Sequence, residues 1–177
     1  MITQTEFVNL IMINDIDTIE NIFKNNKFDI SINDFSLFVL ACKYSRNSIV
    51  KLMLKYFNVN ISVNKNWAAR HCTKNDNIEL LSILLDSPSF DYSKDAHNFI
   101  HFAIFNKNIN VLKFLLKNDN INPSHYDNSA ILTCIEKEDF ESFETILNSK
   151  HFNKNIIMEE IIYKAASYHK TIFFEYL

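Results

Sequence analysis

The chain has 177 residues, of which 47% are hydrophobic and 16 are phenylalanine, so it can bury a core, and general disorder is not expected. Its formal net charge is −3 at pH 7, and its charged residues are scattered along the length, which argues against a dedicated nucleic-acid binder with a basic stripe. No run of 18 apolar residues occurs, so we expect no transmembrane helix and no membrane partner.

The cysteines and the first residues bear on the compartment. Three cysteines, an odd number without close pairing, favour a reducing environment over a disulfide framework. The sequence from Met1 to Glu6 lacks the basic start and long apolar stretch of a secretory signal. We therefore expect a soluble, intracellular, cytoplasmic protein.

The chain contains no glycine but 24 asparagines. Turns that need a positive φ normally use glycine, and asparagine is the next-best residue because its short polar side chain offsets part of the left-handed cost. We therefore expect asparagine to form these turns. An AT-rich genome would give the same bias, so the bias carries no functional argument.

An apolar template recurs every 31 residues along the chain, without insertion or deletion. Self-similarity at a fixed period predicts stacked supersecondary elements that bury their apolar faces against one another. The repeats are 1–31 (an N-terminal cap), 32–62, 63–93, 94–124, 125–155 and a truncated 156–177. Each repeat is expected to form two short helices and a loop.

The first helix of each later repeat is expected to begin near Ser36, Trp67, Asn98, Ser129 or Glu160. Serine and asparagine favour the N-cap position, so we expect Ser36, Asn98 and Ser129 to act as N-caps. Five residues further on, every one of these helices carries a small side chain. A position kept small is where we expect a neighbouring helix to approach closely, and it is occupied by Ala41, Cys72, Ala103, Cys134 and Ala165.

The second helix carries the large aliphatic residues. Apolar side chains at offsets of three, four and five residues predict one broad buried face. In the three central repeats these residues are Ile49, Leu52, Met53 and Leu54, then Leu80, Ile83, Leu84 and Leu85, then Val111, Phe114, Leu115 and Leu116.

The loop between repeats pairs an apolar residue with aspartate or asparagine, whose side chain can accept a hydrogen bond from the nearby backbone and hold a turn. The pairs are Phe28 and Asp29, Val59 and Asn60, Phe90 and Asp91, Ile121 and Asn122, and Phe152 and Asn153. Both prolines, Pro88 and Pro123, fall in these loops, as the missing N–H of proline requires.

These repeats resemble ankyrin repeats, whose consensus opens Thr-Pro-Leu-His-x-Ala and continues through an Ile/Val-Val-x-x-Leu-Leu helix to an Asp-Val-Asn loop. Residues 98–103 (Asn-Phe-Ile-His-Phe-Ala) match the opening, and residues 47–54 match the second helix. The usual period is about 33 residues, and the family's glycines are absent here. The resemblance implies an all-α, ankyrin-like helix-pair solenoid of about five and a half repeats with short loop fingers, in a single domain over 1–177.

The same resemblance implies a non-catalytic scaffold that binds a partner protein on the concave face, formed by first helices and loops. The contact positions in that family lie just before each first helix and two to three residues after its small residue. Here they are Phe35, Lys43, Tyr44, Asn66, Lys74, Asn75, His97, Phe105, Asn106, Asn128, Glu136 and Lys137. Trp67 fits packing between repeats and partner contact about equally well.

The last repeat stops partway through its second helix, which makes a poor cap for a stack. Phe173, Phe174 and Tyr176 lie near this end. The alternative function is therefore a structural spacer, or a segment of a longer repeat array, that self-associates through its uncapped C-terminal repeat.

We expect no enzyme, no cofactor and no metal site. His97 and His101 have the spacing of two metal ligands on a helix face, but His97 precedes the helix, and the resemblance implies a structural hydrogen bond for His101. Cys72, beside His71, occupies the small-residue position and lacks the partner set of a catalytic thiol. The acidic residues of 136–144 are typical of a solvated face, and a chain without glycine has no glycine-rich phosphate loop.

Overall fold

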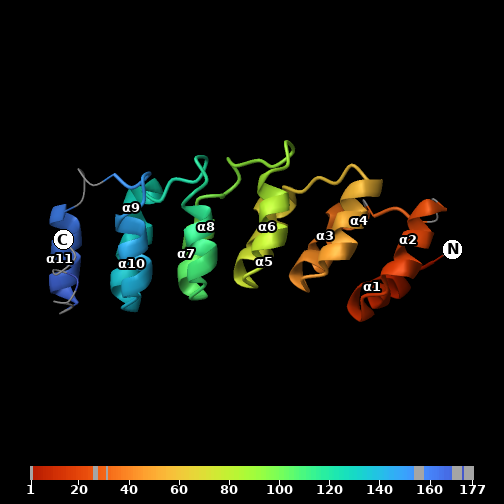
Figure 1. Cartoon of the computed structure of the whole chain (residues 1–177), viewed down its shortest axis with the longest axis horizontal. Coiled ribbons are helices and arrows are strands. Elements are labelled where there is room, and N and C mark those ends of the chain that lie inside the picture. Colours follow the sequence, from red (N-terminus) through yellow and green to blue (C-terminus); the bar gives the residue numbers. More distant parts are fainter. Residues whose placement is uncertain (1, 26–27, 31, 154–157, 169–172, 174–177) are drawn as a thin grey trace. The chain divides into compact units, whose positions relative to one another are not determined.

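The computed structural model describes residues 2–25, 28–30, 32–153, 158–168 and 173, and this part of the chain forms eleven α-helices and no β-strand (Figure 1). The all-helical class predicted from the sequence is confirmed. The helices are α1 (Gln4–Ile13), α2 (Ile16–Lys24), α3 (Ile32–Lys43), α4 (Asn47–Tyr56), α5 (Val63–Lys74), α6 (Ile78–Leu85), α7 (Asn98–Phe105), α8 (Ile109–Leu115), α9 (His125–Lys137), α10 (Phe140–Leu147) and α11 (Met158–Ser167). None of these helices is long and apolar enough to cross a membrane.

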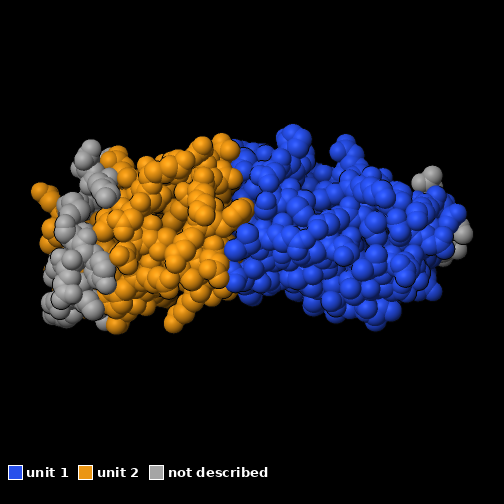
Figure 2. Space-filling view, in the orientation of Figure 1, with its two compact units in different colours: residues 1–94 blue, residues 95–177 orange. Residues whose placement is uncertain are grey.

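The chain divides into two compact units, unit 1 at residues 1–94 and unit 2 at residues 95–177 (Figure 2). The division falls one residue after the predicted boundary between repeats 63–93 and 94–124. Consecutive helices pack in pairs, α1 with α2, α3 with α4 and α5 with α6 in unit 1, and α7 with α8 and α9 with α10 in unit 2. The first helices also pack on one another, α1 on α3 and α3 on α5, and in the other unit α7 on α9 and α9 on α11. Within each unit the helix pairs therefore follow the predicted repeats.

The small residues of the first helices are completely buried. Ala41 and Cys72 in unit 1, and Ala103, Cys134 and Ala165 in unit 2, are each 0% exposed. A backbone hydrogen bond also recurs in four of these repeats: the N–H of the residue just before the second helix donates to the carbonyl oxygen of the small residue. The N···O distances are 2.9 Å from Arg46 to Ala41, 2.9 Å from Asn77 to Cys72, 2.9 Å from Asn108 to Ala103 and 3.0 Å from Asp139 to Cys134. The small residues are therefore part of the core of each unit, and the predicted close approach of a neighbouring helix stays a prediction.

A left-handed residue joins the two helices of each pair. The residues are Asn14, Ser45, Asp76, Lys107 and Glu138, all exposed and with φ values between 53° and 60°. The prediction that asparagine forms these turns is wrong at four of the five positions. The left-handed C-terminal cap needs only a backbone conformation, and an exposed side chain of any kind can occupy it at a cost of about 1–2 kcal/mol.

Replacing Lys107 by glycine is therefore expected to raise the free energy of unfolding by about 0.5–1 kcal/mol, because relief of left-handed strain exceeds the added entropy of the unfolded chain. Urea denaturation followed by far-UV circular dichroism measures the change. The control is Asn14→Gly, for which a gain near zero is expected since asparagine already tolerates this conformation. A less stable Lys107→Gly protein would contradict the strain argument.

The second helices bury a face that differs from the predicted face at one position. Side chains at offsets zero, one and four are buried, with Ile49, Val50 and Met53, then Leu80, Leu81 and Leu84, then Val111, Leu112 and Leu115 all at most 1% exposed. The offset-three residues Leu52, Ile83 and Phe114 are only half-buried. At about 100° per residue, offsets zero, one and four share one arc of the helix, and offset three lies outside it.

Left-handed residues also precede three of the first helices' predicted starts. Phe35, Asn66 and Asn128 have φ values of 58°, 60° and 60°. The helical turns begin earlier, at Ile32, Val63 and His125, so the predicted starts mark where the uninterrupted right-handed helix begins. Helix α7 begins at Asn98, as predicted, but its N-cap is His97, without a side-chain bond. Ser129 is not an N-cap either, because its Oγ lies 3.0 Å from His101 Nε2.

The Asx turns predicted for the loops are confirmed wherever both partners are described. The Oδ1 atoms of Asn60, Asp91 and Asn122 accept hydrogen bonds from the backbone N–H groups two residues on, with N···O distances of 3.2, 3.0 and 2.8 Å. The expected partners of Asp29 and Asn153 lie outside the described residues. Both prolines lie outside the helices, as predicted.

A serine side chain in one loop accepts a hydrogen bond from a backbone N–H of the next loop and so joins the two loops. Ser62 Oγ accepts from the backbone N–H of Asp91 at 2.8 Å in unit 1, and Ser124 Oγ accepts from that of Asn153 at 2.9 Å in unit 2. The apolar residues of these loops are buried, since Val59, Phe90, Ile121 and Phe152 are at most 8% exposed. Loops without strand pairing are therefore held by side-chain bonds and apolar contacts.

Aromatic side chains pack in the core of both terminal repeats. In the first repeat, Phe7 stacks on Phe23 and Phe28, with ring centroids 5.7 and 4.5 Å apart. At the other end Phe173 is 0% exposed and packs against Phe143 of α10 at 4.8 Å. The other two aromatic residues of the predicted open end, Phe174 and Tyr176, lie outside the described residues.

Candidate functional site

The ends of the first helices in unit 1 expose a mixed basic and aromatic surface. Lys43 and Tyr44 close α3, Lys74 and Asn75 close α5, and all four side chains are exposed. Lys43 Nζ lies 5.5 Å from the centroid of the Tyr44 ring, and Asn75 Nδ2 donates to Lys43 O at 2.6 Å. We call these four residues the unit 1 turn row.

The corresponding positions in unit 2 are Phe105, Asn106, Glu136 and Lys137, which we call the unit 2 turn row. All four are exposed, and Phe105 keeps 58% of its surface accessible. Lys137 Nζ lies 5.1 Å from the Phe105 ring centroid, and Tyr168 Oη donates to Glu136 Oε1 at 3.0 Å. Eight of the twelve sequence-predicted contact residues thus lie on the two turn rows.

The other four predicted contact residues precede the first helices, and two of them are buried. Asn66 is 0% and Asn128 is 5% exposed, while Phe35 and His97 are half-buried. Asn66 Nδ2 donates to Asp91 O at 2.9 Å and to Lys94 O at 2.6 Å, so this side chain holds the following loop. A partner cannot reach the side chains of Asn66 and Asn128, and both leave the predicted contact set.

His101 of α7 and His97, the N-cap of this helix, both make structural hydrogen bonds. His97 Nδ1 accepts from the Asn122 N–H at 3.1 Å, and its ring packs on His125 with centroids 4.0 Å apart. Burial, and then the charge of His125, lower the pKa of His97, and burial lowers the pKa of His101. The His101 bond to Ser129 reaches the next repeat. The described residues contain no group of three or more His, Cys, Asp or Glu side chains that could hold a metal ion.

These histidines make the stability of unit 2 depend on pH. A histidine whose pKa is lower in the folded than in the unfolded chain binds more protons when unfolded, so it stabilises the fold above its unfolded pKa of 6.5 and loses this contribution as pH falls through the folded pKa. We expect the urea midpoint to fall as pH drops below 6.5. His101→Gln should reduce this pH dependence, and an unchanged pH dependence in this variant would contradict the assignment.

A groove between α3 and α5 in unit 1 adjoins the unit 1 turn row at Lys43. It has a volume of about 220 Å³ and is lined by Val39, Leu40, Lys43, Trp67 and His71, together with Ser36 and Asn64. The indole of Trp67 is 49% exposed and stacks on the His71 ring, with centroids 5.9 Å apart and planes at 26°. We call this feature the Trp67 groove. The sequence does not assign a role to Trp67, because the groove forms only where α3 and α5 meet.

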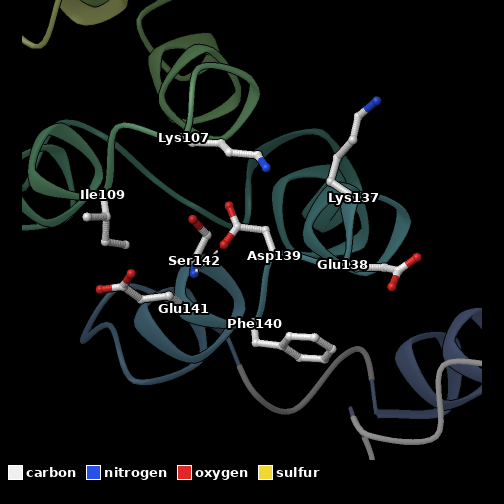
Figure 3. Close-up of a pocket in the computed structure, with 8 residues that line it drawn as sticks. All are labelled: Lys107, Ile109, Lys137, Glu138, Asp139, Phe140, Glu141 and Ser142. Carbon is white, nitrogen blue, oxygen red and sulfur yellow. Dashed lines mark hydrogen bonds between the residues drawn. The ribbon is translucent and has the colours of Figure 1, made fainter.

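Unit 2 has a hollow of about 280 Å³ between the Lys107 turn and the start of α10 (Figure 3). The Lys107 side chain extends toward Asp139, and that of Lys137 points away from it (Figure 3). Asp139 Oδ1 accepts from the Ser142 N–H at 3.1 Å and caps α10, and Glu141 pairs with Lys113 at 3.0 Å. These carboxylates therefore have structural or solvated roles, and the hollow is typical of a charged turn surface.

The cysteines occupy positions unsuited to nucleophilic chemistry. Cys42, Cys72 and Cys134 are free and buried. Burial raises the pKa of Cys42 and of Cys134 well above the ordinary thiol value, which suppresses the reactive thiolate.

A comparison of the chain with protein-family models, curated proteins and solved structures gives no significant match.

Proposed function

We propose that this chain is a non-catalytic, ankyrin-type scaffold that binds a partner protein along the exposed ends of its first helices. The proposal is supported by one contrast within the repeat. The small residues of the first helices in the repeats after the first, and the aliphatic residues at offsets zero, one and four of the second helices α4, α6 and α8, keep their chemistry and are buried. By contrast, two adjacent positions at the ends of the first helices are exposed, and the pair differs from repeat to repeat. These pairs are Met12 and Ile13, Lys43 and Tyr44, Lys74 and Asn75, Phe105 and Asn106, and Glu136 and Lys137.

Exposed side chains that vary on a constant backbone are what a binding surface requires, since the scaffold is kept while specificity changes. Tyr44 and Phe105 are the exposed aromatic anchors of the two turn rows, and aromatic residues dominate binding energy at interfaces. The three buried free cysteines favour a reducing, cytoplasmic location. The histidines and carboxylates described above already have structural partners, which supports a non-catalytic role.

The test is a double substitution, Tyr44→Ala with Phe105→Ala. Because both side chains are exposed, we expect unchanged helical circular dichroism and at least about a tenfold loss of partner capture from native lysate, as for two anchors of more than 1 kcal/mol each. Tyr163→Ala is the matched control, since Tyr163 is 75% exposed but lies on α11 outside the turn rows. Capture that survives the double substitution would remove the turn rows as the binding surface.

The second candidate function is a self-associating spacer or array segment. It is favoured by the exposed apolar side chains of α11, where Ile162 is 44% and Tyr163 is 75% exposed. Size-exclusion chromatography with light scattering distinguishes the two functions. A concentration-dependent dimer that is lost in an Ile162→Glu variant supports self-association, and a monomer at all concentrations argues against it.

A further inference from the structure

Trp67 departs from the chemistry of its own repeat position. The residues 31 positions before it and 31 and 62 positions after it are Ser36, Asn98 and Ser129, so this place in the repeat needs no more than a small polar side chain. Trp67 is the single tryptophan of the chain, and half of its surface stays accessible, with 49% exposed. Packing within the repeat therefore does not account for so large a side chain.

The groove beside Trp67 is apolar at its base. Val39 is 7% exposed and Leu40 is half-buried, and both lie on α3, facing the α5 side of the groove. Stacking on His71 holds the indole as one wall. A rigid aromatic wall over an aliphatic floor is the arrangement in which interface anchors bury a large apolar side chain.

The rim of the Trp67 groove is basic. Lys43 lines it, and among the described side chains no carboxylate does. The pKa of His71 is lowered first by burial and then by the positive charges of Lys43 and Lys74, so both ammonium groups act on the groove.

Several other exposed lysines have a carboxylate partner. Lys51 pairs with Glu79, Lys113 with Glu141 and Lys150 with Asp119. Lys43 forms no such pair with the described residues, and its contact is the Tyr44 ring. A groove lined by an apolar floor and by Lys43, which has no carboxylate partner among the described residues, favours an acidic occupant.

We propose that the Trp67 groove is the docking site for an acidic protein segment, which inserts one large apolar side chain against Trp67 and Leu40 while a carboxylate approaches Lys43. This inference depends on the proposed protein-binding function and adds the chemistry of the partner. Single-stranded nucleic acid could also stack on an exposed indole. It is disfavoured because the apolar floor offers nothing to phosphates and the chain has a net charge of −3.

The single tryptophan provides the assay. The probe is a short acidic synthetic peptide with one central leucine, titrated into the full chain while the emission of Trp67 is followed. We expect a saturable blue shift, because the leucine displaces water from the indole, and an affinity that falls with added salt. Peptides in which glutamine and asparagine replace the acidic residues, or serine replaces the leucine, should bind at least about fivefold more weakly.

The decisive variant is Lys43→Glu, which keeps Trp67 and changes one exposed side chain. It should weaken the acidic peptide about fivefold or more, since an attraction becomes a repulsion. The matched control is Lys117→Glu, an exposed lysine of unit 2 outside the groove, which changes net charge equally and should leave binding unchanged. Circular dichroism verifies that both variants stay folded.

Three results would overturn this inference: no saturable shift with any acidic peptide, equal weakening by the two charge reversals, or tighter binding of a thymidine oligonucleotide that competes for the same Trp67 signal. The proposed function has a separate readout. If the Tyr44 and Phe105 double variant loses its captured partner while acidic peptides leave Trp67 unaffected, only the acidic-segment inference fails. If capture survives that double substitution, the proposed function fails whatever the peptides do.

Discussion

Replacing Leu115 by alanine is expected to lower the free energy of unfolding by about 2–5 kcal/mol. Leu115 lies on α8 and is 0% exposed, and α8 packs on both α7 and α10. Replacing its isobutyl group by a methyl group takes away apolar burial and leaves a cavity that the surrounding helices fill only in part. Urea denaturation followed by circular dichroism measures the loss. Trp67 fluorescence, which originates in unit 1, tests in the same samples whether the two units unfold together.

The matched control for Leu115 is its neighbour Phe114. The Phe114 side chain is larger but only half-buried, so Phe114→Ala should cost less than Leu115→Ala even though it removes more atoms. A loss below about half a kcal/mol for Leu115→Ala would place it among surface substitutions and contradict the assigned buried face. The reverse order of the two losses would show that offset three, and not offset four, faces the core.

Replacing Asn66 by alanine is expected to cost about 2–4 kcal/mol, because two effects add. Asn66 is 0% exposed, and its amide is the donor to the carbonyl oxygens of Asp91 and Lys94, which lose this partner in the variant. Its φ of 60° also favours asparagine over alanine. Asn66→Gly separates the effects, since glycine accepts the backbone conformation but restores neither bond, and it should recover part of the loss.

Asn75 supplies the control for Asn66. Its Nδ2 also donates to a backbone carbonyl of another helix, that of Lys43 at 2.6 Å, but the residue is exposed and its φ is −91°. Water can replace this bond, so Asn75→Ala should cost no more than about 1 kcal/mol. Equal losses for the two alanine variants would mean that the Asn66 bonds are not the support of the loop that the structure assigns to them.

The parts of the fold that follow from spacing were predictable from the sequence. The helix pairs, the buried small residues such as Ala103, and the Asx turns such as that of Asn122 each follow from a local rule applied at one period. The arc of the second helices was misjudged because Leu52 and Val50 are both apolar, and only packing determines which of them is buried.

Other features depend on contacts that a single sequence does not reveal. Asn66 and Asn75 are both asparagines and lie near opposite ends of α5. Asn66 is buried and bonded to the following loop, whereas Asn75 is exposed. The left-handed turn at Lys107 violates residue preference, so no composition rule indicates it. The chemistry of the Trp67 groove emerges from two helices whose facing residues lie about one repeat apart in the chain, and neither helix alone contains it.

The serine bonds between loops have a direction. In each observed case the acceptor, Ser62 or Ser124, belongs to the earlier loop and the donor N–H to the later one. A ribosome releases the N-terminal side first, so every such acceptor is synthesised before the group that it receives. Without the later loop, the serine hydroxyl of the earlier loop has only water as a partner. Each bond can therefore form as soon as the later loop leaves the ribosome, and successive loops should join in the order of their synthesis.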